Sequence, residues 1–285
     1  MCELLALSTS QPTQLTFSLH TLAARAGAGS TTRDGWGVAF FQGSDVALFR
    51  EPAPAGDSPL VRYLETRSPS THLAISHIRH ATRGTVQLSN TQPFVRELGG
   101  RMHVFAHNGD LPDVGHSLRL ALGSYRPVGQ TDSEFAFCAL LARLRPLWQG
   151  AEAPSVQART GLLAAFAADL RGFGPANFLY ADGDLVFAHG HRRMQHGRPR
   201  AEPPGLWVMQ RHCTNVGPAP DCGVGVAVGD AERVALFIAS VPLSDEAWRP
   251  LAEGELIVAR AGEIVATDPS APTPVVGPGA TSQRS

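Results

Sequence analysis

Short apolar runs rich in β-branched and aromatic residues recur along the chain, separated by polar or glycine-containing stretches. Runs of this length and composition are typical of β-strands. They predict strands at 36–41, 72–78, 102–107, 177–181, 185–189, 234–241 and 255–260. Asp182-Gly183 and Ala261-Gly262 each join two such runs and put glycine where a tight hairpin turn takes a positive φ.

Helical periodicity lies between the strand-like runs. Thr131 and Glu134 have the spacing of a capping box, and an apolar stripe then follows until Pro146. A second helix is predicted at about 158–171 and a weaker one at about 15–25. Strands gathered toward both ends with helices between them predict an α+β fold with mainly antiparallel sheets.

The predicted domain covers 2–267. Residues 268–285 are mostly Pro, Gly, Ser and Thr without apolar periodicity, which predicts a disordered tail. The proline-containing region 196–222 is expected to be a surface excursion of the domain. GVGVAVG (223–229) lacks the following helix of a dinucleotide-binding loop, so we expect a strand there and no cofactor.

Composition narrows the class of protein. The 285 residues are 43% apolar and 17% charged, as in globular proteins, and the net charge of −1 provides no basic surface for nucleic acid or membrane. No run approaches the roughly 20 apolar residues of a membrane helix, and no secretory pattern is visible, so a cytoplasmic location is expected. All 24 basic residues are arginine, which excludes Schiff-base lysines and the P-loop lysine. Four irregularly spaced cysteines do not indicate a disulfide framework.

The residue after the initiator methionine is Cys2. Removal of Met1 would leave a thiol and a free α-amine on one residue, so that nucleophile and base lie together. Four further stretches carry polar chemistry: DGWGVAFF (34–41), HIRHATRG (77–84), FAHNGDL (105–111) and QTDSE (130–134). Taken singly, each has an ordinary explanation as a turn, a helix start or an ion-pair partner.

Taken together and in this order, these stretches resemble the class II glutamine amidotransferase family. NTQPFVRELGGRMHVFAHNGDL and VGQTDSEFAFCALL are similar to the compact stand-alone bacterial members over long runs. The resemblance implies an N-terminal-nucleophile hydrolase with a four-layer αββα sandwich of two antiparallel sheets. It implies glutamine, or a γ-glutamyl amide, as the substrate.

The resemblance also implies roles for residues. Cys2 would attack the γ-carboxamide with its own α-amine as base, giving a γ-glutamyl thioester and ammonia. The Asn108 side chain and the Gly109 backbone N–H would stabilise the oxyanion. Arg79 and Thr82 would bind the substrate α-carboxylate, and Asp132 the α-ammonium.

Three further residues are expected around this pocket. Trp36 and Gly37 lie on the stretch that shapes it beside the nucleophile. Where synthase members carry tryptophan and histidine around the Thr82 position, this chain has His80 and Arg83. We expect Arg83 to bind an extra carboxylate on a larger γ-glutamyl substrate.

Several alternatives stay open from the sequence. The thioester step fits a simple glutaminase, a subunit that supplies ammonia to a separate synthase, or a γ-glutamyl peptide hydrolase of the ergothioneine or glutathione type. A penicillin-acylase-type hydrolase and a non-catalytic ligand-binding protein fit the motifs less well. A metal site would draw on the histidines at 72, 77, 80, 103 and 107, yet no zinc-binding spacing is present, and no metal is expected.

Overall fold

Two antiparallel β-sheets form the centre of the protein. The computed structural model describes residues 2–15, 34–80, 84–195, 197–213, 226–227 and 233–268. The first sheet has the strand order β14-β11-β13-β1-β4-β2-β3, with β12 also paired to β1, and the second has the order β16-β15-β8-β7-β6-β5. Every described pairing in both sheets is antiparallel.

The first sheet consists of β1 (Glu3–Leu15), β2 (Trp36–Gln42), β3 (Asp45–Glu51), β4 (Ser70–Ile78), β11 (Trp207–Cys213), β12 (Val226–Ala227), β13 (Arg233–Ala239) and β14 (Arg249–Pro250). The second consists of β5 (Phe94–Leu98), β6 (Arg101–Gly109), β7 (Ala176–Ala181), β8 (Val186–His189), β15 (Leu256–Arg260) and β16 (Glu263–Asp268). A separate hairpin pairs β9 (Arg193–Met194) with β10 (Ala201–Glu202).

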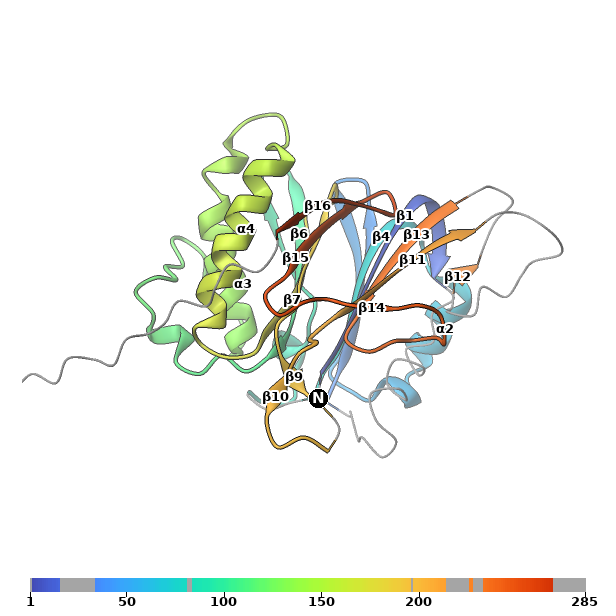
Figure 1. Cartoon of the computed structure of the whole chain (residues 1–285), viewed down its shortest axis with the longest axis horizontal. Coiled ribbons are helices and arrows are strands. Elements are labelled where there is room, and N and C mark those ends of the chain that lie inside the picture. The colour runs from blue at the N-terminus through green and yellow to red at the C-terminus, as the bar shows by residue number, and fades with distance from the viewer. Residues whose placement is uncertain are drawn as a thin grey trace, which may run out of the picture.

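Helices cover the outer face of each sheet. They are α2 (Pro59–Arg67), α3 (Asp132–Leu144) and α4 (Val156–Arg171), and 3-10 turns form η1 (Ala55–Asp57), η2 (Leu88–Asn90), η3 (Val114–His116) and η4 (Leu147–Gln149). Figure 1 shows α3 and α4 beside the second sheet and α2 on the opposite side of the molecule, beside the first. The predicted α+β, four-layer αββα arrangement is confirmed.

Alternating side chains of the strands fill three apolar layers. Along β1, Leu4 and Ala6 belong to the cluster between the sheets, whereas Leu5 and Leu7 pack on the other face with Val61 and Leu64 of α2. Along β6, Val104 and Ala106 face the same intersheet layer. Because side chains alternate along a strand, the next residue of that series, Asn108, points toward the first sheet.

The seven predicted strands are all present, and both predicted hairpin turns are confirmed by φ angles of 87° at Gly183, 52° at Ala261 and 83° at Gly262. The sequence pattern did not predict β1, β3, β5 or α2. The helix expected at about 15–25 falls outside the described residues apart from Leu15, the last residue of β1. Asp268 ends β16, and the rest of the predicted tail is likewise outside them.

The expectation of a surface excursion at 196–222 is wrong for 207–213. These residues form β11, which pairs with β13 along seven residues and with β14 on its other side. Val208 and Met209 are both buried, because both faces of the first sheet are covered. Such a strand lacks the alternation of apolar and polar residues that identifies half-exposed strands. Part of the region, 214–222, is outside the described residues.

The start of α3 carries half of the predicted capping box. The Thr131 hydroxyl accepts a hydrogen bond from the backbone N–H of Glu134 at 3.2 Å. The Glu134 carboxylate does not return to the backbone of Thr131. It accepts from the N–H groups of Val128 and Gly129 and pairs with Arg96, and the charged pair is a stronger interaction than a single capping hydrogen bond.

Among the described helices, none is long and apolar enough to cross a membrane.

Candidate active site

Cys2 lies at one end of the two sheets, next to the last residues of β4 and β6. Its chain continues into β1, and Glu3 pairs with Ile78 at the end of β4. Cys2 is therefore next to the residues that leave β4. Its Sγ donates to the carbonyl of His80 at 3.3 Å and accepts from the N–H of His80 at 3.2 Å.

Burial controls the acidity of the Cys2 thiol. It raises the pKa of Cys2 to about 11, although the N–H of His80 and the charge of Arg79 act in the opposite direction. A thiol with this pKa is protonated at neutral pH and is a weak nucleophile. Chemistry at this sulfur therefore requires a proton acceptor beside it.

Asn108 and Gly109 approach Cys2 from the second sheet, at the end of β6. The Asn108 side-chain amide donates to the Cys2 carbonyl at 2.6 Å, and the Asn177 amide donates to the Asn108 carbonyl at 2.9 Å. A Cβ at Gly109 would lie 1.8 Å from the carbonyl oxygen of Pro175, so only glycine fits there without moving the backbone. The pair is held rigidly by β6 and its neighbour β7.

A cavity of about 120 Å³ opens at Cys2. Its walls are Cys2, His80, Asn108, Gly109, Asp110, Pro175, Arg192, Arg193 and Met194. The sequence patterns did not point to the last three, because HRRM (191–194) matches no motif and lies far from Cys2 along the chain. Arg193 reaches the base of the site and pairs with the fully buried Glu3 at 2.6 Å.

Arg79 is placed beside Cys2 but is almost enclosed, with 3% of its surface exposed. Its N–H donates to the Gly35 carbonyl at 2.8 Å. Its guanidinium donates to the carbonyls of Gly84 at 3.2 Å and Asp34 at 3.4 Å. These contacts hold the guanidinium near Asp34 and Gly84, and its charge is close enough to act on the Cys2 thiol. Thr82 and Arg83 lie outside the described residues.

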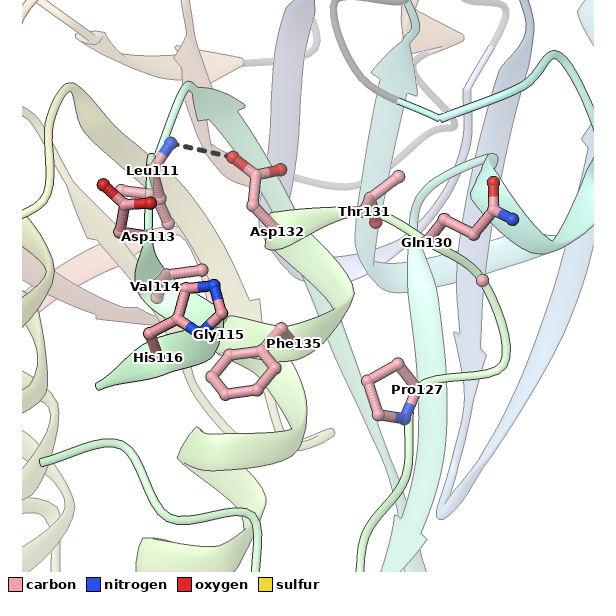
Figure 2. Close-up of a pocket in the computed structure, with 11 residues that line it drawn as sticks. Leu111, Asp113, Val114, Gly115, His116, Pro127, Gln130, Thr131, Asp132 and Phe135 are labelled. Atoms are coloured by element: carbon pink, nitrogen blue, oxygen red, sulfur yellow. Dashed lines mark hydrogen bonds between the residues drawn. The ribbon is translucent and has the colours of Figure 1, made fainter. Parts of the chain in front are cut away.

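Asp132 lines a second cavity, of about 340 Å³, at the beginning of α3 (Figure 2). Its Oδ2 accepts from the N–H of Leu111 at 2.8 Å, and its Oδ1 from the N–H of Ser133 at 2.8 Å. Leu111 comes two residues after Gly109, so the run 109–111 leads from one cavity to the other. Asp113, His116 and Phe135 form other parts of the wall.

Trp36 and Gly37 serve packing in this structure. Trp36 is fully buried in the layer between the first sheet and α2, and its indole N–H donates to Glu51 at 3.0 Å. A Cβ at Gly37 would come within 2.4 Å of the Gln92 carbonyl and 2.7 Å of Cγ of Arg50. Neither residue lines the two cavities described above. Their part in shaping the pocket stays a prediction.

Burial keeps several histidines of the two sheets neutral. His103 contacts the Tyr180 hydroxyl at 2.6 Å and the Leu98 carbonyl at 3.0 Å, and His107 contacts Ser133 at 2.9 Å. Burial lowers the pKa of His103 to about 4 and the pKa of both His77 and His189 to about 3. Among the described residues, no group of three or more histidine, cysteine or acidic side chains is arranged to hold a metal ion.

These pKa values predict loss of stability in mild acid. Histidine in an unfolded chain has a pKa of about 6.5. Below that pH the unfolded chain therefore binds protons, whereas these histidines stay unprotonated in the folded protein. The free energy of unfolding should therefore fall as the pH falls from about 6.5 to about 4, by up to about 1.4 kcal/mol per pH unit for each such histidine. Urea denaturation at several pH values measures the slope, which should be smaller in His103→Gln. A constant free energy between pH 6.5 and 5 would contradict the assignment.

Comparisons with known proteins identify the family of this chain. The family model for class II glutamine amidotransferases matches residues 1–282. YafJ of Escherichia coli (strain K12), described as "Putative glutamine amidotransferase", is 34% identical over 259 residues, covering 90% of this chain and 96% of YafJ. The crystal structure of a "predicted glutamine amidotransferase" from Pseudomonas aeruginosa PA01 superposes with a TM-score of 0.66 at 33% identity, covering 93% of this chain and all of that one.

A more distant likeness identifies the fold alone. The glutamine phosphoribosylpyrophosphate amidotransferase of B. subtilis has a TM-score of 0.59 at 15% identity, and the match covers 94% of this chain and 49% of that one. The two antiparallel sheets between helices form the sandwich fold that these amidotransferases share, and Cys2 and the end of β6 meet at one edge of it. The chain belongs to the class II glutamine amidotransferase family, and it is an enzyme of that family.

Proposed function

We propose that this enzyme hydrolyses the γ-carboxamide of glutamine through a thioester on Cys2. The observation that carries the proposal is that Cys2 and Asn108, which come from different sheets, line the same small cavity. The side-chain amide of Asn108 donates a hydrogen bond to the Cys2 carbonyl at 2.6 Å. A nucleophile and a preorganised hydrogen-bond donor at one cavity are the minimum that acyl transfer requires.

Removal of Met1 would provide the proton acceptor that the thiol needs. A free α-amine has a pKa of about 7.7–8.0 and can take the Cys2 proton at neutral pH, which the thiol with a pKa of about 11 does not release by itself. Sulfur then attacks the amide carbon, and Asn108 with the Gly109 N–H stabilises the oxyanion. The protonated α-amine returns its proton to the leaving nitrogen as the C–N bond breaks. Water attacks the thioester in the second half, giving glutamate and the free thiol.

The amino-acid head of the substrate would extend from Cys2 along 109–111 toward Asp132. Arg79 supplies the positive charge for the α-carboxylate, and Asp132 the negative charge for the α-ammonium. Thr82 and Arg83 belong to the same proposed head site. The ammonia released at Cys2 goes to solvent or to an acceptor bound by a separate synthase subunit.

Intact mass spectrometry tests the proposal directly. Incubation with 6-diazo-5-oxo-L-norleucine, a glutamine-like diazoketone, should add one adduct to Cys2 with loss of N₂, on a chain that lacks Met1. Pre-incubation with L-glutamine should slow the reaction and D-glutamine should not. Retained Met1, or an adduct on another residue, would refute the mechanism. Comparing turnover of L-glutamine with that of γ-glutamylglycine then decides between a glutaminase and a γ-glutamyl peptide hydrolase.

A further inference from the structure

The two charges of the proposed head site lie on separate parts of the chain. Arg79 follows β4 of the first sheet, and Asp132 begins α3, which packs on the second sheet. If one amino acid is to be bound by both its α-carboxylate and its α-ammonium, the distance between these two protein charges must be maintained.

Asn90, in the NTQPF stretch (90–94), connects the two parts. Its Nδ2 donates to the Thr85 carbonyl at 2.9 Å, and its Oδ1 accepts from the N–H of Gln130 at 2.7 Å. Thr85 follows Gly84, whose carbonyl accepts from the Arg79 guanidinium at 3.2 Å. Gln130 lies two residues before Asp132. A continuous series of hydrogen bonds and short chain segments thus runs from Arg79 through Asn90 to Asp132.

The packing around Asn90 admits little change. Its side chain is fully buried. A Cβ on Gly84 would lie 2.8 Å from Nδ2 of Asn90, and Gly84 has a φ of 72°. A Cβ on Gly129 would lie 2.3 Å from Oδ1. The loop at Gly84 and the loop at Gly129 pack against opposite ends of the Asn90 amide, and each has glycine at the point of contact.

The Asn90 amide also suits both contacts in a way few side chains can. Its nitrogen faces a carbonyl and its oxygen faces an N–H, so donor and acceptor are both required. On the α3 side, Glu134 binds the neighbouring N–H groups of Val128 and Gly129, which fixes the loop that Asn90 contacts. Asn90 therefore links a segment that is already rigid to the segment that carries Arg79.

We propose that Asn90 is a positioning residue that sets the spacing between Arg79 and Asp132 and thereby makes the enzyme select a substrate with a free amino-acid head. The inference rests on the proposed function of these two charges. It predicts that loss of Asn90 weakens recognition of the head while the reactivity of Cys2 is unchanged. Misplacement of a binding group by about 1 Å can cost about 100-fold in rate.

Two alkylating agents separate these effects. In 6-diazo-5-oxo-L-norleucine the Cys2 sulfur displaces N₂ from the protonated diazoketone and the reagent carries the amino-acid head. In chloroacetamide the same sulfur displaces chloride and there is no head. In Asn90→Ala, the second-order rate for the diazoketone should fall about 10- to 100-fold, and the rate for chloroacetamide should stay within about twofold.

Asn90→Asp provides a near-isosteric variant, since it keeps the acceptor for Gln130 and loses the donor to Thr85. It should show the same selective loss. Thr71→Ala is the matched control, because Thr71 is also buried and lies at the other end of β4, where its hydroxyl is 2.8 Å from each of the Phe41 and Leu73 carbonyls and can donate to either. It should leave both rates unchanged relative to the wild type.

Each result is decisive. An equal loss of both rates in the Asn90 variants would show a merely structural role and overturn the inference, as would no loss of either rate. If wild-type Cys2 reacts with chloroacetamide and not with the diazoketone, the proposed function itself fails, and the positioning role with it. A combined Asn90→Ala and Asp132→Asn variant adds a further check: its loss of diazoketone rate should be clearly smaller than the product of the two single losses.

Discussion

Cys2→Ala should lower turnover of L-glutamine by about 10⁴-fold or more, because it removes the sulfur that forms the thioester in the proposed mechanism. No other described cysteine side chain can take over, since Cys138 is fully buried within α3 and has no access to the cavity at Cys2. Release of ammonia, followed with a coupled glutamate dehydrogenase assay, measures the loss. The thermal midpoint should change little, since the alanine keeps the β1 backbone pairing.

The matched control is Cys138→Ala, which should retain turnover within about threefold despite some loss of stability from the vacated volume. A second variant, with one extra residue kept ahead of Cys2, retains the thiol and converts the α-amine into an amide. It should be as inactive as Cys2→Ala, because an amide nitrogen cannot accept the thiol proton. Full turnover in either Cys2→Ala or the extended chain would exclude Cys2 as combined nucleophile and base.

Asn108→Ala should lower kcat for L-glutamine by about 10²- to 10³-fold and leave KM nearly unchanged. The reason is that a donor aimed at the developing oxyanion acts mainly in the transition state. In the structure the same amide donates to the Cys2 carbonyl at 2.6 Å, so it already lies beside the proposed nucleophile. Steady-state kinetics over a range of glutamine concentrations separates kcat from KM.

Asn108→Asp tests whether the amide acts as a donor or only fills space. The two side chains have the same shape, but the carboxylate offers no proton at neutral pH and adds a negative charge near the oxyanion. It should lower kcat at least as much as Asn108→Ala. Activity within tenfold of the wild type in both variants would remove Asn108 from the oxyanion site and leave the Gly109 N–H without its partner.

The sequence predicted the class of fold because its strongest patterns were local. Apolar runs of strand length, two glycine-containing hairpin turns and the Thr131 cap all became the predicted elements. β11 was missed for a physical reason: a strand covered on both faces loses its alternation, and nearby prolines suggested a loop. β1 was missed although it is central, since its last residues are polar and pair only in part.

Some residues of the candidate site could likewise be predicted from the sequence and others could not. Cys2, Asn108 and Gly109 were identified from a short ordered set of motifs, and the fold brings them to one cavity. Arg192, Arg193 and Met194 carry no motif and reach that cavity because the β9–β10 hairpin folds back under the start of β1, where Arg193 pairs with Glu3. A long-range ion pair of this kind leaves no periodic pattern in the chain.

Several properties follow from the amino-acid sequence alone: the positions of seven strands and two hairpin turns, the arginine-only basic chemistry, and the presence of a thiol and an amide suited to the proposed thioester chemistry. The tertiary structure decided which of them meet. It buried the Cys2 thiol enough to raise its pKa and brought the Asn108 amide from the other sheet to the Cys2 carbonyl. It also connected the segments that carry Arg79 and Asp132 through the Asn90 side chain. Desolvation and contact between distant segments depend on how two sheets stack, and no local run of residues determines that.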